Sequence, residues 1–161
     1  MYKPLIPQLI LIQALIKNSS LEWIIQKGTE IGVSQFYFYP SALSIKQKLS
    51  SIQIQRYQRI LISSLKQCNR LDLPAIKLGF PLLNIPLFFG DLNEEAPLLS
   101  QKTQLPAALV IGPEKGFTKK EIEELKTKGQ GVRLAPYILR AETAAITGLS
   151  LLANSPITTI S

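Results

Sequence analysis

The sequence predicts an α/β fold: one domain, residues 1–161, with a mostly parallel sheet flanked by helices. Three observations lead to this prediction. Segments of strand type and helix type alternate along the chain, which favours parallel pairing. The two clearest strands, Leu9–Ile16 and Ala107–Ile111, are continuous apolar runs, as expected of strands buried on both faces. A length of 161 residues suits a single domain with a sizeable core.

The composition is that of a globular protein and excludes several classes. Apolar residues make up 46% of the chain and charged residues 18%. No apolar run approaches a bilayer span and residues 1–20 show no signal-peptide pattern, so we expect a cytoplasmic protein without a membrane partner. The single Cys68 excludes an internal disulfide framework. Because histidine is absent, we expect no metal site and no histidine-activated nucleophile, which excludes most hydrolases.

The first elements after Leu9–Ile16 have recognisable boundaries. Ser19–Glu22 has the Ser-x-x-Glu pattern of a capping box and predicts a helix that runs to about Glu30. Gly32 is the expected C-terminal stop of this helix. Val33–Tyr39 is β-branched and aromatic, which predicts a second strand, and Pro40 closes it.

The segment Ser51–Cys68 is predicted as a basic amphipathic helix. All of the net charge of +7 comes from residues 1–90, and six basic residues without an acid occupy residues 41–71. On a helical wheel four cations fall within a sector about 80° wide. They are Arg56, Arg59, Lys66 and Arg70, and the apolar residues Ile54, Tyr57, Leu61, Leu65 and Cys68 lie opposite them. Such a cationic stripe suits phosphate contacts, and its alternative interpretation is an ordinary solvated surface.

The middle of the chain carries weaker signals. Ala75–Leu78 is predicted as a short third strand. Pro81–Gln104 contains prolines, a glycine and an acidic pair, which predict turns and one short helix.

The last third is clearer. After the strand Ala107–Ile111, Thr118 and Glu121 form a second capping box, and the helix that it starts should end at Gly129. Val132–Ala135 is predicted as a strand and Glu142–Ala153 as a mostly apolar helix.

Two segments should lie at the carboxyl ends of strands, where open α/β sheets bind ligands: Gly112–Gly116 and Pro136–Arg140. Neither GxxxxGK[ST] nor GxGxxG occurs, and Glu114 would repel a phosphate. A ligand with hydroxyl or ammonium donors fits this loop better. The alternative is that Gly-Pro-Glu-Lys-Gly is only a tight turn into a capped helix.

The two segments together resemble a known family. IGPEKGFTKKEIEEL followed by VRLAPYILRAETAAITGLSLL is similar to the C-terminal signature of RsmE-type enzymes. QALIKNSSLEWIIQKGTEIGV, residues 13–33, resembles the first strand and helix of that family, and QCNR, residues 67–70, resembles a further element. These are RNA methyltransferases of the SPOUT superfamily, which methylate N3 of a uridine in 16S ribosomal RNA of the small ribosomal subunit.

The resemblance implies a SPOUT domain with a C-terminal trefoil knot, S-adenosylmethionine as cofactor, and a homodimer whose pocket lies near the subunit interface. Carried over by motif, one side of the cofactor site comes from the first glycine loop and the other from the segment before the last helix. The residues are Ile111, Gly112, Pro113, Glu114 and Gly116 on one side, and Leu134, Ala135, Ile138 and Leu139 on the other.

The resemblance also suggests roles in catalysis and RNA binding. Methylation of N3 requires loss of its proton, so an arginine near the uracil oxygens would favour the anionic base. We assign Arg140 to this role and Glu142 as its orienting partner or as the base; the alternative is a helix-start ion pair. RNA backbone contact is assigned to Lys27, Arg56, Arg59, Arg70 and Lys115.

Three departures from the family pattern stand out. Lys115 replaces the second loop glycine, Ala135 replaces a glycine, and Tyr137 replaces an arginine. The chain also begins where the knotted domain begins, without the usual N-terminal β-rich RNA-binding domain. Two other functions therefore stay open: a non-catalytic knotted module for RNA binding or ribosome assembly, and a SPOUT methyltransferase that acts on transfer RNA.

Overall fold

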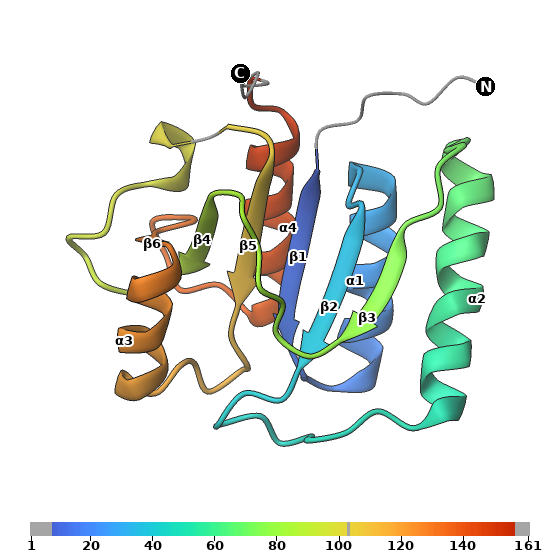
Figure 1. The fold of residues 1–161 in the computed structure, drawn as a ribbon, viewed down its shortest axis with the longest axis horizontal. Coiled ribbons are helices and arrows are strands. Elements are labelled where there is room, and N and C mark those ends of the chain that lie inside the picture. The colour runs from blue at the N-terminus through green and yellow to red at the C-terminus, as the bar shows by residue number, and fades with distance from the viewer. Residues whose placement is uncertain (1–7, 103, 157–161) are drawn as a thin grey trace.

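The computed structural model describes residues 8–102 and 104–156. It contains a six-stranded sheet in the order β3-β2-β1-β5-β4-β6, and every neighbouring pair is parallel (Figure 1). The strands are β1 (Leu9–Ala14), β2 (Gln35–Tyr39), β3 (Ala75–Leu78), β4 (Leu87–Gly90), β5 (Ala107–Ile111) and β6 (Gln130–Val132). The helices are α1 (Asn18–Ile31), α2 (Ser51–Cys68), η1 (Leu99–Gln101), α3 (Lys119–Lys128) and α4 (Ala141–Ala153). The predicted α/β class and the parallel sheet are confirmed.

The centre of the sheet is formed by β1 and β5, whose residues are all buried. Their register places Leu9 opposite Ala107 and Gln13 opposite Ile111. Continuous apolar sequence is what such a position requires, because side chains on both faces of a central strand leave water. The sequence placed β5 correctly, and it extended β1 two residues too far, to Ile16.

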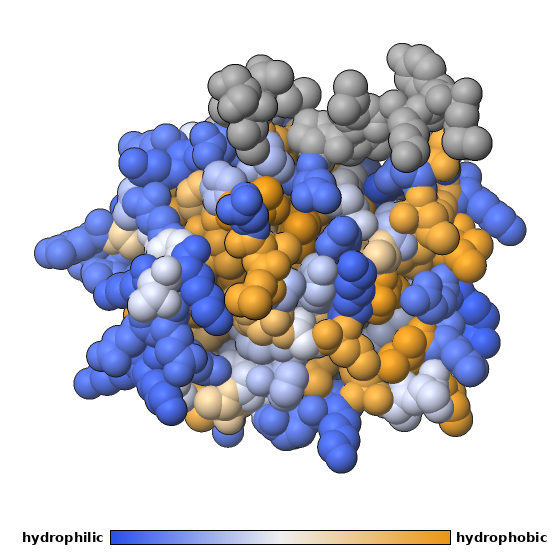
Figure 2. Space-filling model, viewed as in Figure 1, coloured by the Kyte–Doolittle hydropathy of each residue, from blue (hydrophilic) through white to orange (hydrophobic). Residues whose placement is uncertain are grey.

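Helices cover one face of the sheet and a mixed layer covers the other. Helices α1 and α4 lie behind the sheet in the view of Figure 1, and α2 stands at its right-hand side and packs on α1. All three contribute to the larger core, which includes Phe36 and Leu109. On the opposite face, α3 and the connection from β3 to β4 cover a second core built around Ile12 and Val110. Figure 2 shows apolar side chains gathered over the middle of this face, whereas its left-hand edge, over α3, is hydrophilic. Within the described residues, no helix has the length and apolarity needed to cross a membrane.

The start of α1 differs from the prediction. The helix begins at Asn18, one residue before the predicted cap, and Lys17 is its N-cap without a side-chain hydrogen bond. The capping box Ser19–Glu22 is therefore wrong, because Glu22 lies within the helix and accepts hydrogen bonds from Asn18 and Arg56. The predicted stop is confirmed, since Gly32 takes a left-handed conformation with φ 118°.

Helix α2 has the predicted bounds and a cap that the sequence analysis did not identify. The Ser50 side chain accepts the Gln53 N–H, and the Gln53 side chain accepts the Ser50 N–H in return. On its inner face Tyr57 and Leu61 are fully buried, as predicted. Asn69 ends the helix in a left-handed conformation.

The segment predicted as turns, Pro81–Gln104, contains the strand β4 as well as the short helix η1. Its apolar run is only three residues long and lies between Pro86 and Gly90, so periodicity gives no signal. The predicted strand Val132–Ala135 is shifted, because β6 ends at Val132 and the residues after it form a loop.

Helix α3 is capped as predicted. The Thr118 side chain accepts the Glu121 N–H at 3.2 Å, and Glu121 accepts the Thr118 N–H at 2.8 Å. Gly129 ends the helix in extended rather than left-handed backbone. A side chain at this position is excluded by close approach, because a Cβ would lie 2.2 Å from the carbonyl oxygen of Leu87. Gly129 thus lets β6 run directly beside β4.

Candidate functional site

A cavity of about 470 Å³ lies at the carboxyl ends of three adjacent parallel strands, β4, β5 and β6. Its walls come from Gly90–Leu92 after β4, from the loop after β5, and from the segment Val132–Leu139 after β6. Its volume is that of a small-molecule site, and its position is the one that open α/β sheets use for ligands.

The loop between β5 and α3 forms one wall. Gly112 leads the chain out of β5, and a Cβ there would lie 3.1 Å from the Phe117 ring, which is tighter than ordinary contact. Gly116 has φ 79°, a conformation that favours glycine, and its N–H donates to the Pro113 carbonyl at 2.9 Å. The loop is therefore a tight turn that also forms a wall of the cavity, and the interpretation of Gly112–Gly116 as a ligand-binding loop stays a prediction.

The segment after β6 forms the opposite wall. Arg133 fixes its start, because its N–H donates to the Pro97 carbonyl and its Nε donates to the Ala96 carbonyl, both at 2.9 Å. The following residues turn along the cavity toward α4. Tyr137 and Ile138 are 85% and 80% exposed, so the mouth of the cavity carries an aromatic and an aliphatic side chain in water.

The structure brings most of the predicted cofactor residues into this one cavity. Those that line it are Ile111, Gly112, Gly116, Leu134, Ala135, Ile138 and Leu139. Pro113 and Glu114 belong to the same loop and are not among the lining residues. The Glu114 carboxylate accepts the N–H of Lys17 at 3.2 Å and so joins this loop to the start of α1.

Neither residue of the predicted catalytic pair is among those that line the cavity; both follow its lining segment along the chain. Arg140 is the N-cap of α4 and is exposed; it directly follows Leu139, which lines the cavity. Glu142 lies in the first turn of α4. Within the described residues the ion pairs are Lys27–Glu30, Arg56–Glu22 and Arg70–Asp72. The helix-start ion pair between Arg140 and Glu142, the alternative explanation, is not among them.

The five residues assigned to RNA lie in different environments. Lys115 lines the cavity, and Arg59 is exposed on α2. Lys27 lies 3.5 Å from Glu30, and Arg56 is paired with Glu22 of α1. The Lys27–Glu30 pair lies within α1, whereas Glu22 reaches Arg56 from a neighbouring helix, so the helical wheel of α2 alone could not reveal this second partner.

Arg70 corrects the prediction of a purely cationic stripe. It lies beyond the end of α2, its side chain is 11% exposed, and its Nη1 donates to the carbonyls of Thr29 and Val33 at 2.9 Å. Its Nε donates to Asp72 at 3.0 Å, and this hydrogen bond is the main cause that lowers the pKa of Asp72. The guanidinium is thus used within the fold, and we do not include Arg70 in the RNA contact.

The cavity also contains residues that the sequence analysis missed, chiefly Asp91 directly after β4 and Arg133 directly after β6. An acid that follows an apolar run at the carboxyl end of a parallel strand would have been a signal, but β4 itself was not predicted. Within the described residues, no group of three or more potential metal-binding acids or cysteines occurs.

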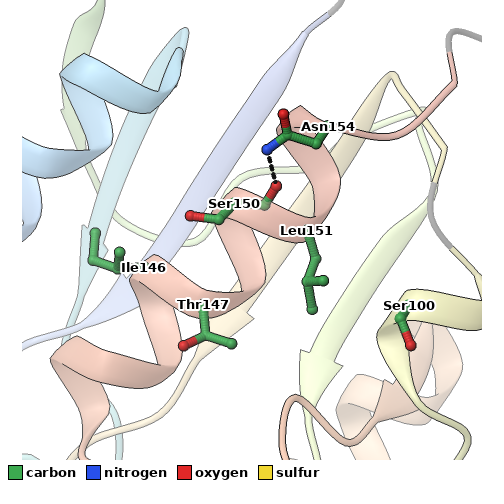
Figure 3. A pocket seen from close by; sticks show the side chains of 6 residues that line it. All are labelled: Ser100, Ile146, Thr147, Ser150, Leu151 and Asn154. Atoms are coloured by element: carbon green, nitrogen blue, oxygen red, sulfur yellow. Dashed lines mark hydrogen bonds between the residues drawn. The ribbon is translucent and has the colours of Figure 1, made fainter.

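A second, more open depression of about 650 Å³ lies on the outer side of α4 (Figure 3). It is lined by Ile146, Thr147, Ser150, Leu151 and Asn154 of that helix and by Ser100 of η1. Its side chains are apolar or neutral, and the Asn154 amide donates to the Ser150 carbonyl at 2.7 Å. Its lining residues carry no charge and none of them lines the cavity at the carboxyl ends of the strands, so it has the character of a contact surface rather than a catalytic site.

Comparison with known proteins shows which family the chain belongs to. A family model described as RNA methyltransferase domain matches residues 3–153. The ribosomal RNA small subunit methyltransferase E of Mesomycoplasma hyopneumoniae is 32% identical over 158 residues, which cover 86% of this chain and 66% of that protein. The chain thus spans slightly less than two thirds of the length of this curated relative.

Two solved structures share the fold. A methyltransferase from Legionella pneumophila in complex with the cofactor SAM is 27% identical, with a TM-score of 0.83 over 93% of this chain and 67% of that one. The ribosomal RNA small subunit methyltransferase E of Neisseria gonorrhoeae bound to S-adenosyl methionine is 26% identical, with a TM-score of 0.75 over 89% of this chain and 64% of that one. Together with the family model over nearly the whole chain, they show that this chain belongs to the RNA methyltransferase domain family.

Proposed function

We propose that this domain is an S-adenosylmethionine-dependent methyltransferase that methylates N3 of a uridine in 16S ribosomal RNA. The observation that carries the proposal is the meeting of Ile111–Gly116 and Leu134–Leu139 in one cavity at the ends of adjacent parallel strands. The two relatives named as small subunit methyltransferases support ribosomal RNA as the substrate.

The residues of the cavity fit S-adenosylmethionine. Leu134, Ile138 and Leu139 offer apolar surface to an adenine ring, and Gly90 and Gly112 leave backbone accessible where side chains would fill the space. The cofactor carries a net positive charge and several hydroxyl and ammonium donors, so an acid in the cavity is complementary to it. When bound, it supplies an electrophilic methyl group.

The chain's own residues would orient the uridine and remove the proton from its N3. Arg140 would donate hydrogen bonds to the uracil oxygens and stabilise the negative charge that the ring gains when N3 loses its proton. Glu142, in the first turn of α4, would accept that proton or orient Arg140. The anionic N3 held by these residues would be the nucleophile that takes up the methyl group supplied by the bound cofactor.

We also propose the features that the family resemblance implies for the whole protein. Residues 1–161 form one SPOUT domain whose C-terminal part is threaded as a trefoil knot; the segment Val132–Leu139 and α4 would supply the threaded part. The protein acts in the cytoplasm as a homodimer. The depression on the outer side of α4 supports a homodimer. Its lining is uncharged and includes the apolar side chains of Ile146 and Leu151, and it lies on the same helix that Arg140 caps.

RNA contact is assigned to Lys115 at the cavity and to Lys27, Arg56 and Arg59 on the adjoining helices. Arg59 carries the clearest case, since it is exposed and has no ion-pair partner among the residues that the structure describes. Replacement of Arg56 and Arg59 by alanine should reduce the dependence of RNA affinity on salt concentration, because fewer counterions are released on binding.

Transfer of a labelled methyl group to small-subunit RNA, followed by identification of the modified nucleoside, tests the function. We expect label in 3-methyluridine with the wild-type protein. With Arg140→Ala we expect transfer to be lost while calorimetry still shows S-adenosylmethionine binding. Label in transfer RNA instead would favour a SPOUT methyltransferase that acts on transfer RNA. Failure of the wild-type protein to bind S-adenosylmethionine would favour a non-catalytic knotted module for RNA binding or ribosome assembly.

A further inference from the structure

Asp91 occupies the third wall of the cavity, between the two segments that carry the family signature. It follows Gly90 directly, and its N–H donates to the Val132 carbonyl at 2.9 Å, so the backbone at Asp91 continues the pairing of β4 with β6. Its position is therefore fixed by the sheet rather than by a loose loop. The side chain belongs to the lining of the cavity.

The sequence of β6 leaves room for the Asp91 carboxylate. A Cβ at Gly131 would lie 2.6 Å from Oδ2 of Asp91 and 3.0 Å from the Phe89 ring. Gly131 is not among the glycines with positive φ, so it is required here for space and not for backbone conformation. Oδ1 accepts the Asn93 N–H at 3.0 Å. Among the described residues, Oδ2 has no hydrogen-bond donor and Asp91 has no ion-pair partner.

We propose that Asp91 binds the cofactor, either by accepting a hydrogen bond from a ribose hydroxyl or the α-ammonium, or by attracting the positive charge of the sulfonium. This inference rests on the proposed function and adds a binding residue outside the two signature segments. A carboxylate held by a backbone N–H at one oxygen keeps the other oxygen for a ligand. The other acid of the cavity, Glu94, is exposed, and the cations Lys115 and Arg133 cannot take this role.

Asp91→Asn is the test variant. Asparagine has the same shape and accepts the Asn93 N–H equally well, so the local turn is kept while the charge is lost. A hydrogen bond to a charged group corresponds to roughly tenfold or more in affinity. We therefore expect calorimetry to show S-adenosylmethionine binding to Asp91→Asn at least about tenfold weaker than to the wild type. Glu95→Gln is the matched control, because Glu95 is exposed on the same loop, does not line the cavity, and loses the same charge.

Two further compounds identify which group of the cofactor Asp91 contacts. S-adenosylhomocysteine lacks the sulfonium charge, and 5′-methylthioadenosine lacks both this charge and the ammonium but keeps the ribose hydroxyls. Weaker binding of all three compounds to Asp91→Asn assigns the ribose. Weaker binding of S-adenosylmethionine and S-adenosylhomocysteine, but not of 5′-methylthioadenosine, assigns the ammonium. Weaker binding of S-adenosylmethionine alone assigns the sulfonium. Each of these results supports the proposal.

Gly131→Ala provides a second, independent variant, since its methyl group would displace the carboxylate. We expect it to weaken binding in the wild-type background and to add little in the Asp91→Asn background, because both changes remove the same contact. If the wild type binds S-adenosylmethionine and Asp91→Asn binds all three compounds equally well, the role of Asp91 is overturned and the proposed function stands. If the wild type binds none of them, both fall.

Discussion

Arg70 is the residue whose environment differs most from what its sequence position indicates. It follows the basic helix α2 and falls on the same side of the helical wheel as Arg56 and Arg59. In the structure it reaches the carbonyls of Thr29 at the end of α1 and Val33 before β2, and it pairs with Asp72. One guanidinium therefore joins three segments of the chain and satisfies carbonyls that the ends of regular elements leave without partners.

Replacement of Arg70 by alanine should lower the free energy of unfolding by about 2–3 kcal/mol, because it removes charge-assisted hydrogen bonds and leaves two carbonyls without a donor. Urea unfolding measures this change. Arg59→Ala is the matched control, and we expect it to alter stability by no more than about 0.5 kcal/mol. The same two variants should behave in the opposite way toward RNA, where Arg59→Ala lowers the salt dependence of binding. A stable Arg70→Ala protein with altered RNA affinity would contradict the assignment.

At this scale the sequence predicted residue types better than residue partners. The loop residues Gly112 and Gly116 were identified, since glycines next to an apolar strand are a local pattern. The role of Asp91 in the cavity and the pairing of Arg56 with Glu22 were not predicted, because both depend on which elements the fold brings together. A partner on another element leaves no trace in the spacing of the residue itself.

Helix α3 shows how one carboxylate can serve two elements. Glu121 completes the capping box with Thr118 through one carboxylate oxygen. Its other oxygen accepts hydrogen bonds from the Ser41 hydroxyl at 2.5 Å and from the Ala42 N–H at 2.8 Å. It thus joins the start of α3 to the loop after β2. Burial alone would raise the pKa of Glu121, but hydrogen bonds from Ser41, Ala42 and Thr118 outweigh it and lower the pKa.

This shift predicts a pH-dependent contribution to stability. Because the pKa of Glu121 is lower in the folded protein, its contribution is present above the ordinary glutamate pKa of about 4.3 and is lost as the pH falls through the folded value. Glu121→Gln should therefore be less stable than the wild type in urea at pH 7, and the difference should shrink at pH 3. Glu123→Gln, a change of an exposed acid on the same helix, should show no such difference at either pH.

Gly129 is the tightest point between two elements. Since its backbone is extended, alanine at this position meets no conformational penalty, and close contact with the carbonyl and the side chain of Leu87 opposes it. We expect Gly129→Ala to lower the free energy of unfolding by more than about 2 kcal/mol, as overpacking against fixed backbone does. Gly32→Ala has free space around its Cβ and a positive φ, so its cost should come from backbone strain alone, about 1 kcal/mol.

Elements were predicted where their signals are local. The bounds of α2 and β5 and the cap of α3 follow from apolar periodicity and from side chains that bond within one turn. Strands β4 and β6 are four and three residues long and are defined by their pairing with each other and with β5. Pairing across the sheet is not a property of either segment alone, so no reading of Pro81–Gln104 could find it.

For the whole molecule, a parallel sheet could be predicted from the sequence, but its strand order could not. Alternation of strands and helices implies parallel pairing, but many orders satisfy it. The observed order places β1 next to β5 and moves β4 and β6 to one side. This arrangement is what puts the ends of β4, β5 and β6 together and so creates the cavity.

The proposed homodimer is testable at the outer face of α4. Thr147 lines the depression there and does not belong to the core, so Thr147→Arg should place a charge in the interface without disturbing the fold. We expect the dissociation constant of the dimer to rise at least about tenfold in sedimentation experiments, since an unpaired charge is costly to bury. Thr127→Arg on exposed α3 is the matched control and should leave the mass unchanged. A wild-type protein that sediments as a monomer would contradict the homodimer.

The pairing of Leu9 with Ala107 also governs how the chain can be made. Because synthesis runs from the N-terminus, β1, with apolar side chains on both faces, is made before its neighbour β5, which follows only after β2, β3 and β4. Until then one edge of β1 has no strand to pair with, and such exposed edges are prone to association with other chains. The pairing of β2 with β1 covers only the opposite edge, so the middle of the sheet closes late in synthesis, when β5 is added.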